Sequence, residues 1–386
     1  MKKVFAVLGA GMQGTAAAYD LAKFADAQVI RMGDVDLHQA EKSSRRVNEL
    51  IGSAICEPHQ VNALEPANLS KFLDGVDVLI SCVPYWMHPK IAAVAVQSKT
   101  SMVDLGGNTD ITMETLKLDD MAKSAGVTLV PDTGLAPGLV NSLGLWLIEH
   151  LDTCETVKLY CGVLPQNPKP PFNYKLTFNC EGLVTEYDYQ AVVLRNHEIA
   201  LVDTLTETEE LFIDQPELGQ MEAFVTSGGT STAPYTLKDR VTNYEYKTIR
   251  FPGHGFLMKI FKDFGFWNEE AIDVKGTKIV PKDVFNAVFG PELAKFVDRD
   301  MCAVRGVGMG TKDGQPKTLQ IDIFDKEDEV TGFTSMERLT GFSASIYAIE
   351  IANGHMPDGA IRYENGMSGT KFVQELERRG IQLTYS

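Results

Sequence analysis

The chain has 386 residues, 44% of them hydrophobic and 23% charged, a composition typical of a soluble globular protein. Its length exceeds what a single core usually holds, so we expect two domains. The 36 basic and 52 acidic residues give a formal net charge of -16, which argues against a nucleic-acid partner. No apolar stretch reaches the roughly 20 residues of a membrane-spanning helix, so we expect no membrane partner.

The cysteines indicate a reducing compartment. All six are scattered without a CxxC pair, which favours reduced thiols and a cytoplasmic location over disulfides. Neither they nor the seven histidines show metal-ligand spacing, so no metal is expected. The apolar run Val4–Leu8 is interrupted by glycines too early for a signal peptide, and no small-residue cleavage site follows.

The first 136 residues alternate short β-branched runs with helical patterns. Strands are predicted at Val4–Leu8, Val29–Met32, Val76–Cys82, Met102–Leu105 and Val127–Val130. Helices are predicted at Met12–Phe24, Leu37–Leu50, Pro89–Gln97 and Met113–Ala125. This βαβα order predicts an α/β fold, in which a Rossmann-type doubly wound parallel sheet forms a dinucleotide-binding domain over residues 1–136.

The pattern changes after residue 136. A helix at Leu139–Leu151 leads to longer, alternating segments, which suggest a mixed or antiparallel sheet: Thr156–Gly162, Lys175–Phe178, Tyr244–Phe251 and Leu319–Phe324. Lys312-Asp313-Gly314 carries a hairpin turn signal. We expect an inserted α+β domain over residues 137–334, serving substrate binding and oligomerisation. The helical pattern Met336–Ala352 suggests that the segment 335–386 returns to the first domain.

A glycine motif, GAGMQG at residues 9–14, directly follows the first predicted strand and opens the first predicted helix. In such a GxGxxG pattern Gly9 permits a tight turn and Gly11 lets the backbone approach a pyrophosphate. Gly14 lets helix and strand pack closely. The N-terminal residues of the helix, Met12 and Gln13, offer N–H groups to the phosphates. The context therefore predicts a dinucleotide site.

Asp34 selects the cofactor. It lies 20 residues after the last glycine of the motif, where a carboxylate binds the ribose 2′-hydroxyl. A carboxylate at this place would repel the 2′-phosphate of NADP, and Asp36 adds to the repulsion. Arg45 and Arg46 offer an alternative phosphate site, although a solvated helix face explains them better. NAD is the expected cofactor.

Three loops follow the predicted strands, at residues 82–85, 104–108 and 131–138. In an open parallel sheet, ligands bind outside the carboxyl ends of the strands, so these loops are expected to surround the nicotinamide end. The residues expected to contribute there are Val83, Tyr85, Asp104, Gly106 and Asn108. Each loop, taken separately, also fits a plain turn.

Several longer stretches carry a family resemblance. In the first domain they are VLGAGMQG (7–14), DVDL (34–37), VDLGGNTD (103–110) and GVTLVPDTGLAPGLVN (126–141). In the second they are NCEGLVTEY (179–187), EAFVTSGGTSTAPY (222–235) and YKTIRFPGH (246–254). On these residues the chain resembles the family of saccharopine dehydrogenases (glutamate-forming) and lysine dehydrogenases, and within it the bacterial L-lysine 6-dehydrogenases.

The resemblance implies NAD-dependent oxidative deamination of the ε-amino group of L-lysine. The products would be NADH, ammonia and 2-aminoadipate 6-semialdehyde, which cyclises to piperideine-6-carboxylate. It also implies a homodimer or a higher homo-oligomer. Two alternatives stay open: reduction of an imine by a saccharopine or carboxynorspermidine-type enzyme, and NAD binding without catalysis.

The resemblance also implies roles for individual residues. Glu181 occupies a position where the saccharopine reductases carry an arginine, which favours a substrate that bears an ammonium group. Glu181 is therefore the first choice for binding the amine and accepting its proton. Arg250 or Lys175 would hold the α-carboxylate. The remaining expected contributors are Thr230, Tyr85 and Asn108 in substrate binding, and Asp104 and His254 in proton transfer.

Overall fold

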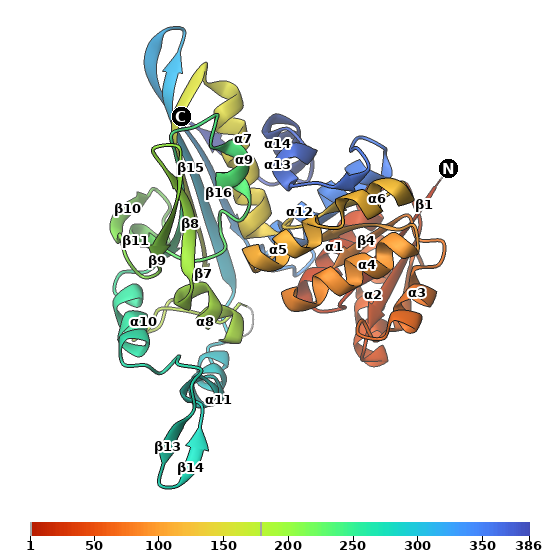
Figure 1. Cartoon of the computed structure of the whole chain (residues 1–386), viewed down its shortest axis with the longest axis horizontal. Helices are drawn as coiled ribbons and strands as arrows, with labels where there is room; N and C mark the ends of the chain where they lie inside the picture. The colour runs from red at the N-terminus through yellow and green to blue at the C-terminus, as the bar shows by residue number, and fades with distance from the viewer. Residues whose placement is uncertain (1, 178–179) are drawn as a thin grey trace.

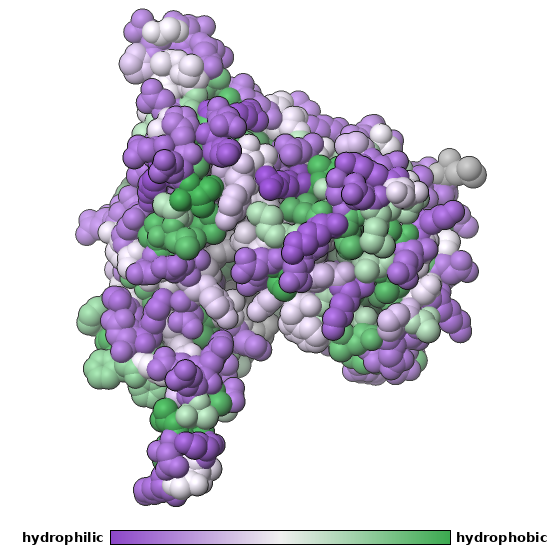
Figure 2. Space-filling model, viewed as in Figure 1, coloured by the Kyte–Doolittle hydropathy of each residue, from purple (hydrophilic) through white to green (hydrophobic). Residues whose placement is uncertain are grey.

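The computed structural model describes residues 2–177 and 180–386. Phe178 and Asn179, which end one expected strand and begin one of the resembling stretches, lie outside the described residues. The chain forms two units side by side, one around each of two large sheets (Figure 1). Hydrophilic residues cover most of the face of the molecule shown in Figure 2. Among the described helices, none is long and apolar enough to cross a membrane.

The first unit contains a seven-stranded sheet in which every described pair is parallel, in the order β17-β6-β5-β4-β1-β2-β3. The strands are β1 (Lys3–Leu8), β2 (Ala27–Asp34), β3 (Cys56–Gln60), β4 (Val78–Ser81), β5 (Ser101–Asp104), β6 (Thr128–Val130) and β17 (Gly359–Ala360). The Rossmann-type parallel sheet expected from the sequence is confirmed. Strand β3 is not among the strands expected from the sequence. It contains Pro58 and lies at the edge of the sheet, where proline is tolerated.

Helices cover this sheet: α1 (Met12–Phe24), α2 (Leu37–Ile51), α3 (Pro66–Leu73), α4 (His88–Gln97), α5 (Thr109–Leu116) and α6 (Asp119–Ala125). The single helix expected at Met113–Ala125 is thus two helices. The break comes at Lys117 and Leu118, and α6 begins with Asp119 and Asp120, acidic residues suited to the first turn of a new helix.

The second unit is organised around a nine-stranded mixed sheet, in which β12 runs parallel to β7 while the other described pairs are antiparallel. Its strands are β7 (Thr153–Pro165), β8 (Gln190–Arg195), β9 (Glu198–Asp203), β10 (Glu209–Ile213), β11 (Gly219–Val225), β12 (Asn243–Arg250), β15 (Asp300–Lys312), β16 (Gln315–Lys326) and β18 (Leu383–Tyr385). The expected mixed sheet is confirmed.

Two local expectations in this unit have different outcomes. The hairpin at Lys312 is confirmed: Asp313 (φ 51°) and Gly314 (φ 70°) form the two-residue turn between β15 and β16. The expected strand at 175–178 is wrong for its described residues 175–177, which are irregular. Side-chain contacts anchor this segment instead of a strand ladder, since Tyr174 packs its ring on His254.

The helices of the second unit are α7 (Val140–His150), α8 (Cys180–Asp188), α9 (Ala233–Leu237), α10 (His254–Asp263) and α11 (Pro281–Ala294). A small hairpin of β13 (Ile272–Val274) and β14 (Thr277–Ile279) projects beyond α11 (Figure 1). The C-terminal segment contacts both units. Helix α12 (Ser335–Ala352) packs on α1, β17 joins the first sheet, α14 (Gly369–Arg378) packs on α7, and β18 joins the second sheet.

Candidate active site

The glycine loop between β1 and α1 has the geometry of a dinucleotide cradle. A Cβ added at Gly14 would lie 1.9 Å from the carbonyl oxygen of Gly9, so only glycine allows the helix to approach the strand this closely. A Cβ added at Gly11 would meet nothing within 4 Å, which leaves open space at the N-terminus of α1. Because the unpaired N–H groups of a helix N-terminus attract phosphate, these residues fit a pyrophosphate.

Asp34 stands at the carboxyl end of β2, next to this loop. Its Oδ2 accepts a hydrogen bond from Ala10 N at 2.8 Å, and its Oδ1 accepts one from Asp36 N at 3.0 Å. The carboxylate is therefore held in place beside the cradle, with further acceptor capacity for a ribose. Arg46 is engaged elsewhere, since its guanidinium stacks 4.1 Å from the centroid of the Phe333 ring.

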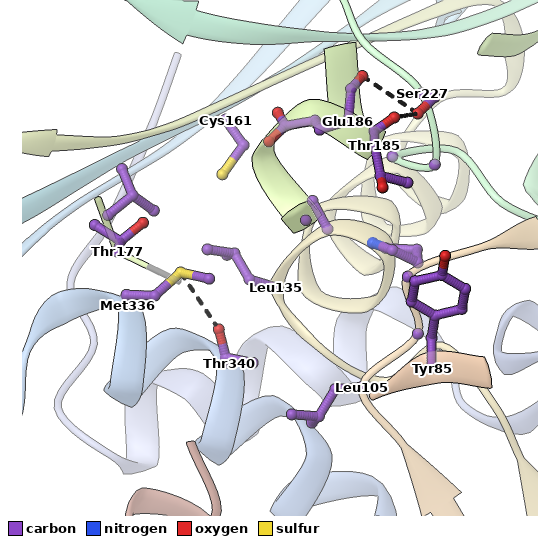
Figure 3. Close-up of a pocket in the computed structure, with 18 of the residues that line it drawn as sticks. Tyr85, Leu105, Leu135, Cys161, Thr177, Thr185, Glu186, Ser227, Met336 and Thr340 are labelled. Carbon is purple, nitrogen blue, oxygen red and sulfur yellow. Dashed lines mark hydrogen bonds between the residues drawn. The ribbon is translucent and has the colours of Figure 1, made fainter. Parts of the chain in front are cut away.

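A cavity of about 340 Å³ lies between the two units (Figure 3). Leu105, Tyr85 and Met336 lie on one side of it, and Glu186, Thr185 and Ser227 on the other. The other described residues that line it are Gln13, Pro84, Gly106, Gly107, Leu135, Ala136, Pro137, Cys161, Val163, Thr177, Gly182, Gly228, Gly229, Tyr246, Arg250 and Thr340.

The nucleotide-binding unit supplies one wall, from loops at the carboxyl ends of its strands. Gly106 and Gly107 bring backbone to the surface after β5, and Tyr85 follows β4 in a short 3-10 helix (Tyr85–Met87). Gln13, from the glycine motif, also lines the cavity, and its buried Oε1 has no hydrogen-bond partner among the described residues. An orphaned acceptor is costly when buried, so this atom is suited to accept a hydrogen bond from a bound ligand.

The second unit supplies the charged wall. Glu186 on α8 and Arg250 on β12 carry the full charges among the described residues that line the cavity. Arg250 Nη2 lies 3.6 Å from Glu186 Oε1, and Arg250 Nε donates to the hydroxyl of Tyr187 at 2.9 Å. Glu186 Oε1 also accepts from Thr248 Oγ1 at 2.8 Å. The arginine is buried, which makes its charge strong toward an anionic group entering the cavity.

Comparison with known proteins assigns the family. Residues 134–381 match the saccharopine dehydrogenase C-terminal domain, and residues 5–130 match the saccharopine dehydrogenase NADP binding domain. The chain belongs to the saccharopine dehydrogenase family.

Curated relatives within and around this family match at low identity. The chain is 25% identical over 259 residues to an alpha-aminoadipic semialdehyde synthase of Arabidopsis thaliana, covering 64% of this chain and 24% of that protein. It is 26% identical over 224 residues to a saccharopine dehydrogenase [NADP(+), L-glutamate-forming] of Pyricularia oryzae, covering 55% and 48%. With carboxynorspermidine synthase of Vibrio cholerae it shares 20% identity over 411 residues, covering 97% and 94%. The matched part is thus half or less of the first two relatives.

Solved structures show the same fold. Apo saccharopine dehydrogenase (L-Glu forming) from Saccharomyces cerevisiae superposes with a TM-score of 0.79 at 20% identity, covering 100% of this chain and 99% of that one. Homospermidine synthase from Legionella pneumophila in complex with NAD gives 0.66 at 14% identity, covering 100% and 91%. The saccharopine dehydrogenase architecture therefore extends over both units of the chain.

Within this saccharopine dehydrogenase fold, the expected carboxylate Glu181 lies outside the cavity lining. The face of α8 toward the cavity consists of Gly182, Thr185 and Glu186, which have the i, i+3, i+4 spacing of one helix face. Glu181 precedes this face, and its side chain is exposed. Glu186, which is not among the residues expected from the sequence, belongs to the same resembling stretch, and that stretch is the signal that points to this helix.

Asp104 and Asn108 organise loops. Asp104 is buried, and its Oδ1 accepts from Gly106 N at 2.8 Å and from Asp132 N at 3.0 Å. It is therefore placed as a loop-ordering carboxylate rather than a proton-transfer group. Asn108 Oδ1 accepts from Asp110 N at 3.0 Å and caps α5. Neither side chain lines the cavity, although Tyr85, Gly106 and Arg250 do. Val83 packs beside the glycine loop, where a Cβ added at Gly9 would lie 3.3 Å from it.

Lys175, Thr230 and His254 also lie outside the cavity lining. Lys175 Nζ donates to the carbonyl oxygen of Asp298, and Thr230 Oγ1 donates to that of Val192 at 2.6 Å. His254 is buried, with Nδ1 at 3.0 Å from Phe172 O and Nε2 at 3.1 Å from the Tyr187 hydroxyl. Burial, with the Arg250 charge beside it, lowers the pKa of His254 to about 3, so the imidazole stays neutral and packs as a structural group.

Proposed function

We propose that the chain is an NAD-dependent L-lysine 6-dehydrogenase, which oxidises the carbon that bears the ε-amino group. The observation that carries the proposal is the charge pattern of the cavity. Its described lining combines one carboxylate, Glu186, and one guanidinium, Arg250, on one wall with a largely apolar opposite wall. This pattern suits a substrate with one amino-acid head group and an aliphatic chain that ends in a reacting, uncharged amine.

The close pairing of these two groups suggests how the head group binds. Arg250 Nη2 and Glu186 Oε1 lie 3.6 Å apart, a separation comparable with that between the α-carboxylate and the α-ammonium group of an amino acid. Arg250 would therefore bind the carboxylate and Glu186 the ammonium group, each with a charge-assisted hydrogen bond. A substrate held in this way directs its side chain toward the opposite wall.

The opposite wall would receive the reacting end. The unpartnered Oε1 of Gln13 is suited to accept a hydrogen bond from the ε-nitrogen, and Tyr85 and Leu105 would shield that end from water. The ε-ammonium group would first lose a proton to solvent, and the oxidised nicotinamide bound along the cradle would supply the acceptor for the hydride that leaves the ε-carbon. Water then hydrolyses the resulting substrate imine to the semialdehyde and ammonia.

Asp34 supports NAD as the cofactor. Both carboxylate oxygens are fixed at the end of β2, so a 2′-phosphate at this place would meet a negative charge. The Arg46 guanidinium does not offset that charge, because it is stacked on the Phe333 ring. The family model that matches residues 5–130 is described as NADP-binding, and a direct comparison of both cofactors is therefore part of the test.

The test is a steady-state screen of the purified protein with NAD and with NADP. L-lysine, L-ornithine, saccharopine and simple diamines are compared by NADH or NADPH absorbance, and released ammonia is assayed. We expect turnover of L-lysine with NAD and stoichiometric ammonia. Absence of lysine oxidation by folded protein that binds NADH would refute the proposal.

The second candidate is saccharopine or carboxynorspermidine-type chemistry, which the curated relatives favour. Saccharopine carries three carboxylates, whereas Arg250 is the one guanidinium in the described lining of the cavity. Preferred turnover of saccharopine with NADP, without release of ammonia, would establish this candidate.

A further inference from the structure

A short loop at residues 227–232, here called the cavity loop, connects β11 to α9 in the second unit. Ser227, Gly228 and Gly229 line the cavity. A Cβ added at Gly229 would lie 2.1 Å from Cδ1 of Tyr246, so the backbone of the loop is pressed against that ring. Ser227 Oγ donates to the carbonyl oxygen of Thr185 at 3.0 Å, as Figure 3 shows. The position of this loop therefore helps to set the width of the cavity.

Two buried carboxylates from distant parts of the chain hold the cavity loop. Ser231 Oγ donates to Oδ2 of Asp132, which follows β6 in the nucleotide-binding unit. Thr232 Oγ1 donates to both oxygens of Glu364, at 2.7 and 3.0 Å, and Glu364 belongs to α13 (Tyr363–Gly366) of the C-terminal segment. Neither carboxylate lines the cavity, and all four side chains are buried.

The backbone at the first contact adopts an unfavourable conformation. Asp132 has φ 66° and Ser231 has φ 44°, in the left-handed region that residues other than glycine rarely adopt. Such residues persist where the surrounding structure requires them, and they concentrate at functional sites. The contact between the two units is therefore maintained at an energetic cost.

Asp132 is also linked to the opposite wall of the cavity through buried hydrogen bonds. Its Oδ1 accepts from Thr112 Oγ1 at 3.0 Å, and its backbone N donates to Asp104 Oδ1 at 3.0 Å. The same Asp104 oxygen accepts from Gly106 N at 2.8 Å, and Gly106 lines the cavity. One continuous set of hydrogen bonds thus runs from the cavity loop to the nucleotide-side wall.

We propose that Asp132 and Glu364 are positioning residues, which fix the cavity loop relative to the wall at Gly106 so that substrate and nicotinamide meet in a reactive arrangement. This inference deepens the proposed function and rests on the cavity being the site of amine oxidation. A misplacement of about 1 Å costs as much as a hundredfold in rate, because reacting atoms must approach within a narrow range of distances. Loosening of the loop should therefore lower kcat more than it raises KM.

The experiment compares variants that break each contact with a matched control. Ser231→Ala removes the hydroxyl that binds Asp132, and Thr232→Val removes the one that binds Glu364. The control is Thr100→Val, because Thr100 is also buried and its hydroxyl donates only within the first unit, to Val76 O at 3.1 Å and Leu73 O at 3.4 Å. Asp132→Asn, which keeps the side-chain shape, is measured as well, so that poor folding of one variant does not decide the outcome.

Two readouts are used for every variant. With L-lysine and NAD, we expect kcat to fall by about tenfold in Ser231→Ala and Thr232→Val, with KM changed less than about threefold. The control should match the wild-type kcat within about twofold. The emission spectrum of bound NADH should shift in both loop variants and stay the same in the control, because the nicotinamide surroundings change only when the loop moves.

The NADH readout separates this proposal from the proposed function. If the wild type does not oxidise lysine but the emission of bound NADH shifts in the loop variants alone, the positioning role stands and the lysine assignment fails. If kcat and emission both equal those of the wild type in folded loop variants, the positioning role is overturned. Lower thermal stability with unchanged kcat and emission overturns it too, since that result describes a purely structural contact.

Discussion

On the nucleotide side, the cavity is lined by glycine backbone at Gly106 and Gly107 and by apolar side chains such as Leu105. On the opposite side, it is lined by the charged pair Glu186 and Arg250. The first wall presents backbone groups and an apolar surface. These suit a flat ligand, such as a nicotinamide ring, that stays the same when the substrate changes. The second offers individual charges. A fold arranged in this way can change its substrate through a few side chains of the second unit and keep the cofactor site intact.

The largest effect is expected at Arg250. Arg250→Ala removes the cation proposed to bind the substrate carboxylate and leaves Glu186 without its charged partner, so kcat/KM for L-lysine should fall by about 10³-fold or more. Arg250→Lys should recover only part of the loss, because an ammonium group lacks the planar fork that binds a carboxylate. The Kd for NADH should stay within about twofold of the wild-type value, because the substitution leaves the nucleotide-side wall of the cavity unchanged. A wild-type KM in Arg250→Ala would exclude Arg250 from substrate binding.

Two matched substitutions on α8 test which face of this helix meets the substrate. Glu186→Gln should lower kcat/KM for L-lysine by about a hundredfold, because the neutral amide loses the charge-assisted bond to the ammonium group. Glu181→Gln, a neighbouring change on the exposed surface of the same helix, should leave kcat/KM within about twofold. Steady-state kinetics on both variants measures the difference. Equal losses in the two would show that the cavity face of α8 has been assigned to the wrong residue.

The cofactor preference is tested by substituting Asp34, which lies beside the glycine cradle. Asp34→Ser removes the carboxylate that would accept the ribose hydroxyls, so KM for NAD should rise by about tenfold or more. KM for NADP should fall at the same time, since the repulsion of the 2′-phosphate is relieved. KM for L-lysine at saturating cofactor should change little. An unchanged ratio of NAD to NADP preference would remove Asp34 from cofactor selection.

The smallest expected effect concerns the pH dependence of stability. Burial, together with the nearby charge of Asp104, raises the pKa of Asp132 to about 8, whereas an unfolded aspartate ionises near pH 4. Between pH 4 and pH 8 the Asp132 carboxyl is protonated in the folded state and ionised in the unfolded state. Its contribution to the free energy of unfolding is therefore complete below pH 4 and is lost as the pH rises to 8. Asp132→Asn removes the titration. Between pH 5 and pH 9 the wild type should therefore lose unfolding free energy relative to the variant, with most of the loss occurring below pH 8.

Urea denaturation of both proteins at pH 5, 7 and 9 measures this difference. Glu364→Gln serves as a second case, because burial raises the pKa of Glu364 to about 7. Parallel pH curves for wild type and Asp132→Asn would show that Asp132 titrates alike in the folded and unfolded states.

The part of the structure that the sequence predicted best depends on local rules. The glycine loop and Asp34 follow from the spacing of residues on one βαβ unit, and the Asp313-Gly314 turn from the conformational freedom of two adjacent residues. On the nucleotide side of the cavity, Gln13, Tyr85 and Gly106 were expected and line it, whereas Asp104 and Asn108 were expected and do not. Strand β3, which is not among the expected strands, contains a proline that a sheet tolerates only at an edge, and the tertiary order of the strands decides which of them lies at an edge.

The charged wall of the cavity, with Glu186 and Arg250, could not be predicted from local sequence patterns. Which face of α8 meets the cavity is decided by Leu183, Val184 and Tyr187, whose side chains are buried in the core of the second unit. His254 was expected at the site, yet its partners Tyr187 and Phe172 lie 67 and 82 residues away in the sequence. Contacts over such distances become visible only once the sheet is assembled.

The C-terminal segment has a consequence for the order in which the chain can fold during synthesis. The edge strand β17 pairs with β6 through Gly359 and Thr128, so the first sheet lacks that strand until most of the chain has left the ribosome. Strand β18 completes the second sheet later still, by pairing with β16. Neither sheet is complete without the C-terminal segment, and the nascent protein must keep an open edge on its nucleotide-binding sheet while strands β7 to β16 of the second unit are being made.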